Sequence, residues 1–337
     1  MSIRLADVAD RTGVSAATVS RVLNGRPGVA QSTRTRVLGA VETLGGRPAE
    51  SRATQGGMVG VVAQDGGSAG VSSLVEHVLT ALHRRGLLPV LSAQAHGAPR
   101  AEPATRKLLT HGASGLVFIG GDHADPVAHH DFLRTLSDER IPHVLVGGGD
   151  FPSHSATISQ DEEWGIGKAV LQLSELGHAR IGMVSGPLRF RTCRRRRDGF
   201  LAALRSLGVR AVESDTWIEH VHHSDGGGAH AADKLMDRGC TALVCDSDTL
   251  ALGALRAARA RSLTVPDDLS LVVAGDSPTA RHMVPSLTVV SPPEEKMAEA
   301  AADALMMAVG GTPLTSLELR FQPDLIIRES TGHAPLF

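Results

Sequence analysis

Five hydrogen-bonding side chains fall within ten residues near the start of the chain: Ser15, Thr18, Ser20, Arg21 and Asn24. A guanidinium fork matches the O6/N7 edge of guanine, a contact that discriminates between bases by roughly 1–3 kcal/mol. Hydroxyl and amide groups suit phosphate oxygens, which fix the register of a protein on a duplex. The set therefore predicts a DNA-contacting surface in which Arg21 reads a base. A phosphate contact or a surface ion pair is the alternative for Arg21.

Two short helices joined by a tight turn would position these side chains. Gly13 can end the first helix in the left-handed conformation, and Val14 would pack beneath the turn. Ser15 supplies an oxygen that caps the second helix. The buried stripe of that helix has helical spacing and consists of Val19, Val22 and Leu23. The residues left facing outward are Ala16, Ala17, Ser20 and Arg21. This pattern predicts a helix-turn-helix, whose second helix enters the DNA major groove.

A third helix and a polar segment follow. Helical spacing resumes over 33–44, with Val37 and Val41 on one face, and Gly45 and Gly46 stop the helix. Residues 47–57 are polar, small and bounded by glycine, as linkers are. We therefore expect a DNA-binding headpiece over 1–46 and a linker or hinge over 47–57.

From Met58 onward, short apolar runs alternate with helical stretches. The predicted strands cover 59–62, 88–92, 115–119, 143–146, 180–184, 242–245 and 269–274, and a helix is predicted over 71–85. Continuous apolar runs are typical of parallel strands that helices cover on both faces. A chain of 337 residues also exceeds one compact core. After the all-α headpiece we therefore expect an α/β fold with two doubly wound lobes.

Charge is distributed unevenly along the chain. Residues 1–52 carry eight Arg and four acidic residues, a net +4, which leaves −6 for the remainder of a chain whose total is −2. A basic end on an acidic body favours a DNA contact confined to that end. A solvated charged surface would give the same asymmetry.

Neither a membrane segment nor a disulfide framework is indicated. No run reaches the roughly 20 apolar residues that span a bilayer, and the amino terminus lacks a signal-peptide core. We expect a cytoplasmic protein, associated with the nucleoid when it is bound to DNA. Cys193, Cys240 and Cys245 are odd in number and lack CxxC spacing, which predicts packing thiols.

A group of metal-ligand residue types stands out in one stretch. It consists of His220, His222, His223 and Asp225. Such a group could ligate a metal, but a polar loop before three glycines explains it equally well. We expect no metal and no cofactor.

The literal residues add a family resemblance. The run LADVADRTGVSAATVSRVLNGRPGV at 5–29, followed by TRTRVLGAVETLG at 33–45, closely resembles the headpiece of the LacI/GalR (lactose and galactose repressor) family of bacterial transcription regulators. The resemblance implies a homodimer on a pseudo-palindromic operator, more often a repressor than an activator. It implies a periplasmic-binding-protein type of body over 58–337, with an effector cleft and three crossovers between lobes. Lobe 1 would comprise about 58–158 and 291–320, and lobe 2 about 159–290 and 321–337.

The resemblance also bears on the DNA contacts. Ala16 and Ala17 stand where the family varies its base-selecting side chains, so discrimination should rest mainly on Arg21. The linker departs from the family, because the segment Ser51–Thr54 has no leucine to wedge between base steps. Arg52 is expected to enter a narrow minor groove by its charge instead. Weak bending of the operator follows.

Six residues are expected in the effector cleft. They are Arg196, Ser247, Asp248, Asp276, Trp164 and His222. The resemblance places Arg196 three residues before Gly-Phe, and Asp248 before Ala-x-Gly. A carboxylate accepts hydrogen bonds from sugar hydroxyls and pairs with an arginine, so Asp248 and Arg196 lead the set. For Trp164 the alternative interpretation is packing at the cleft edge, and for His222 it is the polar loop.

Few aromatic side chains are available to stack on a sugar, because the chain has two Trp, seven Phe and no Tyr. The expected effector is a sugar, a sugar derivative or another polar metabolite, including a phosphorylated one attracted by Arg194–Arg197. A cleft that has lost its ligand is the alternative. A solute-binding protein or an enzyme could share such lobes, but the predicted headpiece argues against a solute-binding protein. The sequence has no P-loop or Gly-x-Ser-x-Gly elbow that would support an enzyme, and we expect no catalytic residues.

Overall fold

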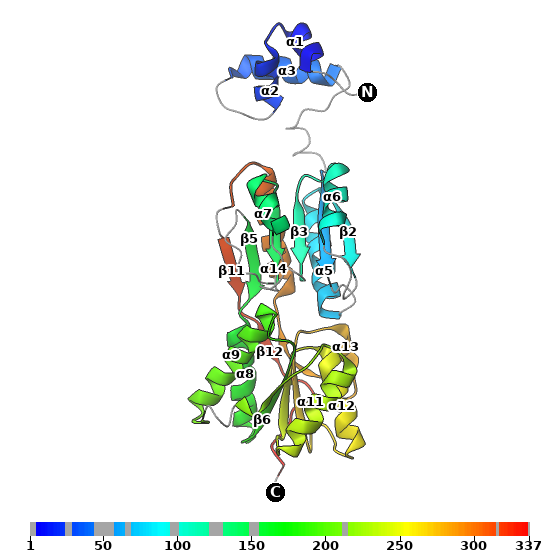
Figure 1. The fold of residues 1–337 in the computed structure, drawn as a ribbon, viewed down its shortest axis with the longest axis vertical. Helices are drawn as coiled ribbons and strands as arrows, with labels where there is room; N and C mark the ends of the chain where they lie inside the picture. The colour runs from blue at the N-terminus through cyan, green and yellow to red at the C-terminus, as the bar shows by residue number, and fades with distance from the viewer. Residues whose placement is uncertain are drawn as a thin grey trace.

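The computed structural model describes residues 5–23, 29–43, 57–64, 69–94, 101–120, 131–147, 155–210, 215–314 and 317–335. Within these ranges three helices form the amino-terminal part, and two six-stranded sheets with their covering helices form the body (Figure 1). None of the helices in these ranges is both long and apolar enough to cross a membrane.

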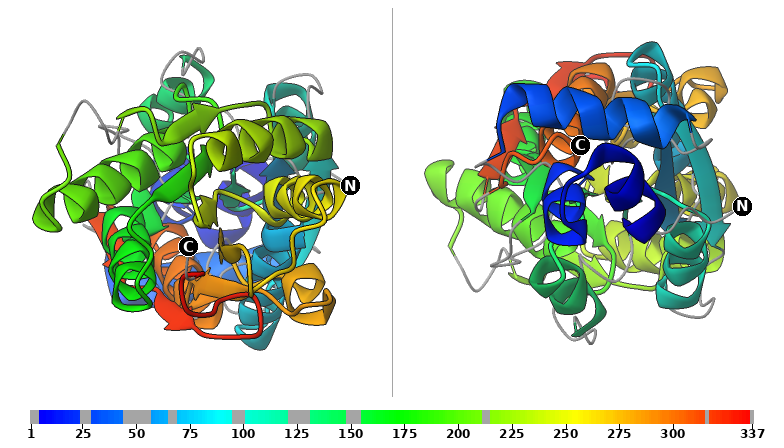
Figure 2. Two further views of the ribbon diagram at one scale, coloured as in Figure 1. Left: turned by 90° about the horizontal axis from the view of Figure 1, so that it is seen from below. Right: turned by 90° about the horizontal axis from the view of Figure 1, so that it is seen from above.

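The amino-terminal helices form a helix-turn-helix with a third helix beside it. They are α1 (Leu5–Thr12), α2 (Ala16–Leu23) and α3 (Gln31–Thr43). Gly13 has a φ of 67°, so the turn uses the left-handed conformation that the sequence predicts. The small core consists of Val8, Val19, Val22, Val37 and Ala40, with Val14 packed against it. Figure 2 shows α3 lying alongside the α1–α2 pair. The predicted helix-turn-helix is confirmed.

The first sheet belongs to lobe 1 and has the strand order β11-β5-β4-β3-β1-β2. Its strands are β1 (Met58–Gln64), β2 (Leu88–Gln94), β3 (Leu116–Ile119), β4 (His143–Val146), β5 (Ala156–Gln160) and β11 (Leu317–Phe321). Every pairing between them is parallel. In this register Val61 pairs with Leu91 on one side and with Val117 on the other.

Helices cover both faces of the first sheet. They are α5 (Ala69–Arg84), α6 (Glu102–Thr110), α7 (Asp131–Asp138) and α14 (Glu294–Val309). Val61 and Val117 pack in the core with α5 and α14, whereas their neighbours Val62 and Phe118 pack in the core with α6 and α7. Successive residues of a strand face opposite sides, so a strand buried on both faces must be apolar throughout. This requirement explains the continuous apolar runs.

The second sheet belongs to lobe 2 and has the order β12-β10-β9-β8-β6-β7. Its strands are β6 (Ile181–Ser185), β7 (Ile218–His220), β8 (Ala242–Cys245), β9 (Ser270–Ala274), β10 (Thr288–Ser291) and β12 (Asp324–Ile326). The pairing of β10 with β12 is antiparallel, and the other pairings are parallel. This arrangement is the doubly wound α/β fold that the sequence predicts.

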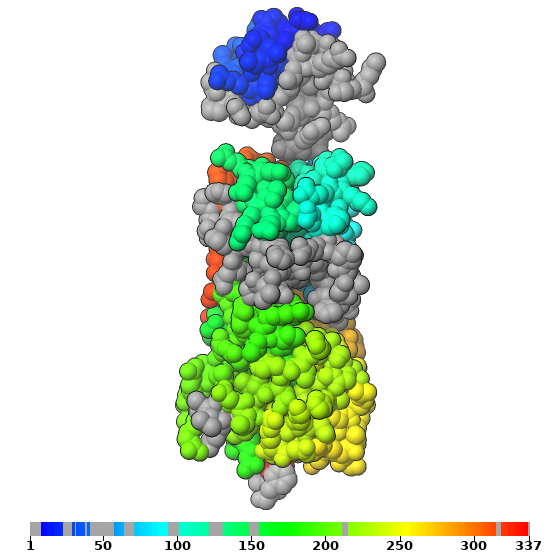
Figure 3. All heavy atoms as spheres, in the orientation of Figure 1, coloured from blue at the N-terminus to red at the C-terminus, as the bar shows by residue number. Residues whose placement is uncertain are grey.

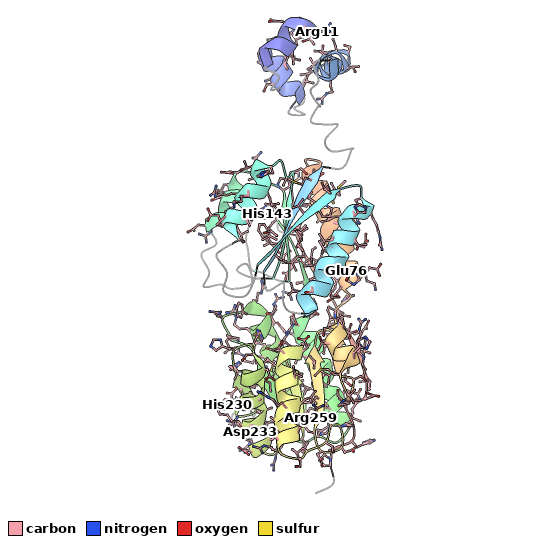
Figure 4. All side chains as sticks on the ribbon, turned by 90° about the vertical axis from the view of Figure 1, so that its right-hand side faces the viewer. Arg11, Glu76, His143, His230, Asp233 and Arg259 are labelled. Carbon is pink, nitrogen blue, oxygen red and sulfur yellow. The ribbon has the colours of Figure 1, made fainter. Side chains whose placement is uncertain are left out.

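The helices of lobe 2 are α8 (Glu162–Glu175), α9 (Arg191–Ser206), α11 (Asp225–Asp237), α12 (Asp248–Ala260) and α13 (Pro278–His282). Residues of α8 and α9 share one core with the sheet, and residues of α11 and α12 share another. In Figure 3 the yellow-green and yellow atoms of α11 and α12 form much of the visible face of lobe 2. The exposed side chains of Asp233 on α11 and Arg259 on α12 are labelled in Figure 4.

The chain passes between the two lobes three times. It does so between β5 and α8, between β10 and α14, and between β11 and β12. Four strands outside the predicted runs, namely β5, β7, β11 and β12, are short or carry polar residues at alternate positions. Their sequences therefore lack the continuous apolar run by which the other strands are predicted. A fifth strand, β10, also lies outside the predicted runs, although its centre is apolar.

Candidate functional site

The amino terminus of α2 is built by the residues that the sequence singles out. The Thr18 amide donates a hydrogen bond to Ser15 Oγ at 3.2 Å, and the hydroxyls of Ser15 and Thr18 lie 2.9 Å apart. A side-chain oxygen at this position satisfies one of the amides left free at the start of a helix. Ser15 therefore caps the second helix as predicted, and its contact with Thr18 leaves both side chains at the exposed end of α2.

One face of α2 is free of core contacts. Ala16, Ala17 and Arg21 are exposed, whereas Val19 and Val22 are buried beneath them. Ser20 is half-buried. The helix has no acidic residue in its first turn and carries Arg21 in its last turn. The exposed face thus presents methyl groups, hydroxyls and one cation. Asn24 and Arg52 lie outside the described residues.

A second candidate site lies where strands of the second sheet end and helices begin. Arg196, on α9, donates from Nε to Glu162 Oε2 at 2.6 Å and from Nη2 to Glu162 Oε1 at 3.3 Å. Its Nη1 donates to the Asp246 carbonyl at 2.7 Å. Burial alone would lower the pKa of Arg196, but the nearby charges of Glu162 and Asp246 raise it overall. A permanently charged, immobilised guanidinium results.

The partner of Arg196 differs from the expected one. The sequence suggests Asp248, whereas the bidentate partner is Glu162, in the first turn of α8. Asp248 instead accepts hydrogen bonds from the Thr249 amide and from Ser277 Oγ, each at 2.9 Å. Ser247 caps α12, accepting from the Leu250 amide at 3.3 Å. These residues begin the same helix, but their hydrogen bonds hold α12 and α13 rather than Arg196.

Asp246 is a site residue that the sequence analysis missed. It is 3% exposed, and its Oδ2 accepts hydrogen bonds from Ser185 Oγ and the Gly186 amide, each at 2.8 Å. Its Oδ1 is buried and has no N–H or O–H donor among the described residues. A carboxylate placed directly after the apolar run 242–245 was the available signal, since such residues line the carboxyl edge of a parallel sheet.

The Asp276 carboxylate pairs with two arginine side chains of lobe 2. Its Oδ1 accepts a hydrogen bond from Arg328 at 2.6 Å, and its Oδ2 lies 3.0 Å from Arg281 Nη2. The carboxylate is 7% exposed and faces two guanidinium groups. Its immediate role is to tie the end of β9 to the carboxyl-terminal segment.

Trp164 and His222 lie at the surface of lobe 2. The Trp164 side chain is 37% exposed, and Lys168 Nζ lies 4.8 Å from its ring centroid. His222 is exposed, and its carbonyl accepts a hydrogen bond from the Ser224 amide at 2.8 Å. Within the described residues, neither side chain hydrogen-bonds to Arg196 or forms an ion pair with it.

The arginine run on α9 is already paired with protein groups. Arg194 donates to the Leu188 carbonyl at 3.3 Å, and Arg197 pairs with Asp198 at 2.7 Å. Arg195 lies 3.5 Å from Glu318 of β11, which links the two lobes. Because each cation has a partner, this run offers less to a phosphorylated effector than its sequence suggests.

Lobe 1 contributes a partly buried carboxyl group, Glu294, on which charges of lobe 2 act. Glu294, in the first turn of α14, accepts a hydrogen bond from Ser73 Oγ at 2.5 Å. Burial raises the pKa of Glu294, and the hydrogen bond from Ser73 and the charge of His77 only partly oppose this effect. The charges of Asp276 and Arg281, both in lobe 2, also act on this carboxyl group. The pKa of Glu294 therefore depends on groups from both lobes.

Comparisons with known proteins agree with this architecture. Residues 4–49 match the model of bacterial regulatory proteins of the lacI family, and residues 170–331 match the periplasmic binding protein-like domain. The HTH-type transcriptional regulator MalR of Streptomyces coelicolor is 40% identical over 339 residues, which cover 99% of this chain and 98% of that protein. The regulator reg1 of Streptomyces lividans is 40% identical over 351 residues, with the same coverage.

A solved structure shows the same fold. The transcriptional regulator CelR–cellobiose complex is similar with a TM-score of 0.71 at 27% identity, covering 98% of this chain and 100% of that one. The headpiece and the two-lobed body thus define a DNA-binding transcription regulator with a periplasmic-binding-protein-like domain. The chain belongs to the LacI family of bacterial regulatory proteins.

Proposed function

We propose that this regulator binds a pseudo-palindromic operator as a homodimer and represses transcription there. The headpiece over 1–46 would contact the duplex, the linker over 47–57 would join it to the body, and the lobes over 58–337 would dimerise and bind an effector. The observation that carries this proposal is α2, which is capped by Ser15 and exposes Ala16, Ala17 and Arg21. Two headpieces are needed because one helix contacts too few base pairs for useful specificity.

The base contact is assigned to Arg21. Ala16 and Ala17 offer only methyl groups, which suit a thymine methyl or a close approach of the helix, whereas Arg21 can bind guanine through two hydrogen bonds. Ser15, Thr18, Ser20 and Asn24 would hold phosphates, and Arg52 would enter the minor groove. Sequence discrimination by this protein would therefore depend mainly on one side chain for each headpiece.

The operator proposal is tested by substituting Arg21. After genomic footprinting with the purified protein has located an operator, we expect Arg21→Ala to weaken operator binding by roughly 10- to 100-fold while binding to random duplex changes little. Arg36→Ala is the matched control, because Arg36 is also exposed but lies on α3. It removes the same charge and should leave the ratio of specific to non-specific affinity unchanged. Equal ratios for both variants in gel shifts would refute the role of Arg21.

We propose a small, polar, hydroxyl-bearing effector for the cleft between the lobes. The solved CelR relative is a complex with cellobiose, and the lobe 2 edge offers Arg196, Ser247 and Asp248 to hydroxyl groups. Such an effector can change operator affinity only by preferring one arrangement of the lobes. Asp276, Trp164 and His222 would lie further out around the same ligand.

A regulator with a ligand-free cleft is the second candidate. It is favoured by the engagement of Arg196, because each of its three nitrogen atoms already donates one hydrogen bond to Glu162 or Asp246. A screen by thermal shift separates the two, because a ligand at 100 times its Kd stabilises the folded state by about 2.7 kcal/mol. If Arg196→Ala leaves the affinity of a discovered effector unchanged, the pocket assignment is wrong.

A further inference from the structure

Three side chains of different elements of lobe 2 converge at the carboxyl edge of the second sheet. They are Cys193 on α9, His223 in the loop between β7 and α11, and Asp246 directly after β8. One potential ligand atom of each, namely a sulfur, a ring nitrogen and a carboxylate oxygen, lies within 4.8 Å of the other two. Residues 193, 223 and 246 are far apart in sequence, so only the fold brings them together.

The Asp246 carboxylate has an unused oxygen at this point. Asp246 is 3% exposed, and its Oδ2 is satisfied, whereas the buried Oδ1 has no N–H or O–H donor among the described residues. The weak S–H donor of Cys193 is the thiol that lies beside this carboxylate. An unsatisfied buried acceptor costs roughly 1–3 kcal/mol, and more when it is charged. A ligand supplied from outside the chain would remove this cost.

Gly186 holds the three groups close together. A Cβ atom at this position would lie 2.9 Å from Cys193 Sγ and would also collide with the His223 ring. The Gly186 amide at the same time donates to Asp246 Oδ2. One residue without a side chain therefore allows the thiol and the imidazole to approach the carboxylate.

The buried charges around the cluster are unbalanced. Arg196 is the cation, and Glu162 and Asp246 are the two carboxylates whose charges act on it. The Cys193 side chain is 1% exposed, and as a thiol it adds no charge to this count. A divalent cation that displaces the thiol proton to solvent would bring these buried charges to zero.

We propose that Cys193, His223 and Asp246 form a zinc-binding site. Sulfur, imidazole nitrogen and carboxylate oxygen are the usual ligands of Zn²⁺, and three protein ligands leave a fourth position for water or a ligand oxygen. Zinc bond lengths place tetrahedral ligand atoms roughly 3.3–3.6 Å apart. The three atoms lie within 4.8 Å of one another, so zinc binding must draw them closer together. Binding forms the sulfur–zinc bond and releases the thiol proton.

The geometry differs from the cluster that the sequence suggests. Of His220, His222, His223 and Asp225, the structure groups only His223 with the other two ligands. Asp225 pairs with Arg256 at 2.9 Å, and His220 Nδ1 lies 3.3 Å from the Gly186 carbonyl. The expectation of packing thiols and of no metal did not foresee this arrangement for Cys193.

The test is titration of the full-length protein with Co²⁺ and then with Zn²⁺. We expect one Co²⁺ for each chain, with a near-ultraviolet charge-transfer band from the thiolate that Zn²⁺ abolishes by displacement. Cys193→Ser should remove the band and weaken Zn²⁺ binding at least 100-fold. Asp246→Asn and His223→Ala should each weaken it at least tenfold while the band remains. Circular dichroism of each variant checks that it is folded.

Cys240→Ser is the matched control, since Cys240 is also a buried free thiol of lobe 2 but is not part of the cluster. It should bind Co²⁺ as the unaltered protein does. An intact thiolate band in Cys193→Ser, or no band at any micromolar Co²⁺ concentration in the unaltered protein, would overturn the proposal. Gel shifts in the presence of a chelator measure operator binding without the metal. The zinc proposal can therefore fail while the operator proposal is confirmed, and the reverse also holds.

Discussion

Arg196 illustrates how a single side chain takes its role from its neighbours. Removing a charged group from water is costly unless good geometry compensates for it. Here Glu162 supplies two contacts, at 2.6 and 3.3 Å, and the Asp246 carbonyl supplies a third. The guanidinium is therefore held in one orientation before any effector arrives. Such preorganisation lowers the entropic cost of binding.

At the same scale, Glu294→Gln should alter the pH dependence of stability. Burial raises the pKa of Glu294, so between the ordinary Glu value and the raised value the folded chain binds more protons than the unfolded chain. The contribution of Glu294 to the free energy of unfolding is therefore fully favourable below the ordinary pKa of Glu. It is lost as pH rises through the raised pKa. Gln does not titrate, so this decrease in stability is absent from the variant. Glu294→Gln should therefore be more stable than the unaltered protein near pH 7, and the difference should disappear near pH 4.

Glu295→Gln is the control for that measurement. Glu295 lies in the same first turn of α14, but its side chain is 69% exposed, compared with 14% for Glu294. It should not change the slope of thermal stability against pH. If the two variants shift the slope equally, the burial of Glu294 is not its cause.

At the scale of elements, α11 and α12 pack through glycine. A Cβ atom at Gly228 would lie 2.8 Å from the Leu250 Cα and collide with the Leu250 carbonyl, and one at Gly253 would lie 2.6 Å from the Ala229 amide nitrogen. The two helix backbones therefore touch directly. This contact places the first turn of α12, with Ser247 and Asp248, close to the loop that carries His223.

Gly228→Ala should separate these helices. Overpacking of this kind costs about 1–3 kcal/mol, which lowers the melting temperature of a domain of this size by roughly 2–4 °C for each kcal/mol. Gly226→Ala, in the same helix, is the control, because a Cβ atom there meets nothing within 4 Å. It should be neutral or stabilise the protein by up to about 1 kcal/mol. Calorimetry that finds both variants equally stable would show that the helices adjust freely.

At the scale of the whole molecule, the two lobes are joined by three crossings and by the contact between Arg195 and Glu318. Short crossings can act as hinges that absorb a change of lobe arrangement. An effector that prefers one arrangement would then move both members of a dimer and alter the spacing of their headpieces. This coupling is part of the proposed function.

The linker sets how strongly the whole complex should bend DNA. Kinking a duplex through the minor groove requires an apolar wedge between base steps, and the segment Ser51–Thr54 contains Ser, Arg, Ala and Thr but no leucine. We expect weak bending of the operator. A circular-permutation gel checks this, and replacing Ala53 with Leu should increase the apparent bend. A sharp central kink with the unaltered protein would contradict the prediction.

Local patterns determined much of this protein without reference to its fold. Gly13, Ser15 and the stripe that includes Val19 and Val22 specify the helix-turn-helix, because a turn, a cap and a helical face are set by residues close in sequence. The continuous apolar runs likewise predicted β1 to β4 of the first sheet and β6, β8 and β9 of the second. Edge strands such as β7 and β12 bury less surface, so their sequences carried little signal.

Only the tertiary structure decided which polar groups meet. Glu162 rather than Asp248 pairs with Arg196, and Cys193, His223 and Asp246 converge although at least 23 positions separate any two of them. Parallel strands bring their carboxyl ends to one edge regardless of their order in the chain, and the order of strands within the sheet is a property of the whole fold. Contacts across that edge therefore have no local signature in the sequence.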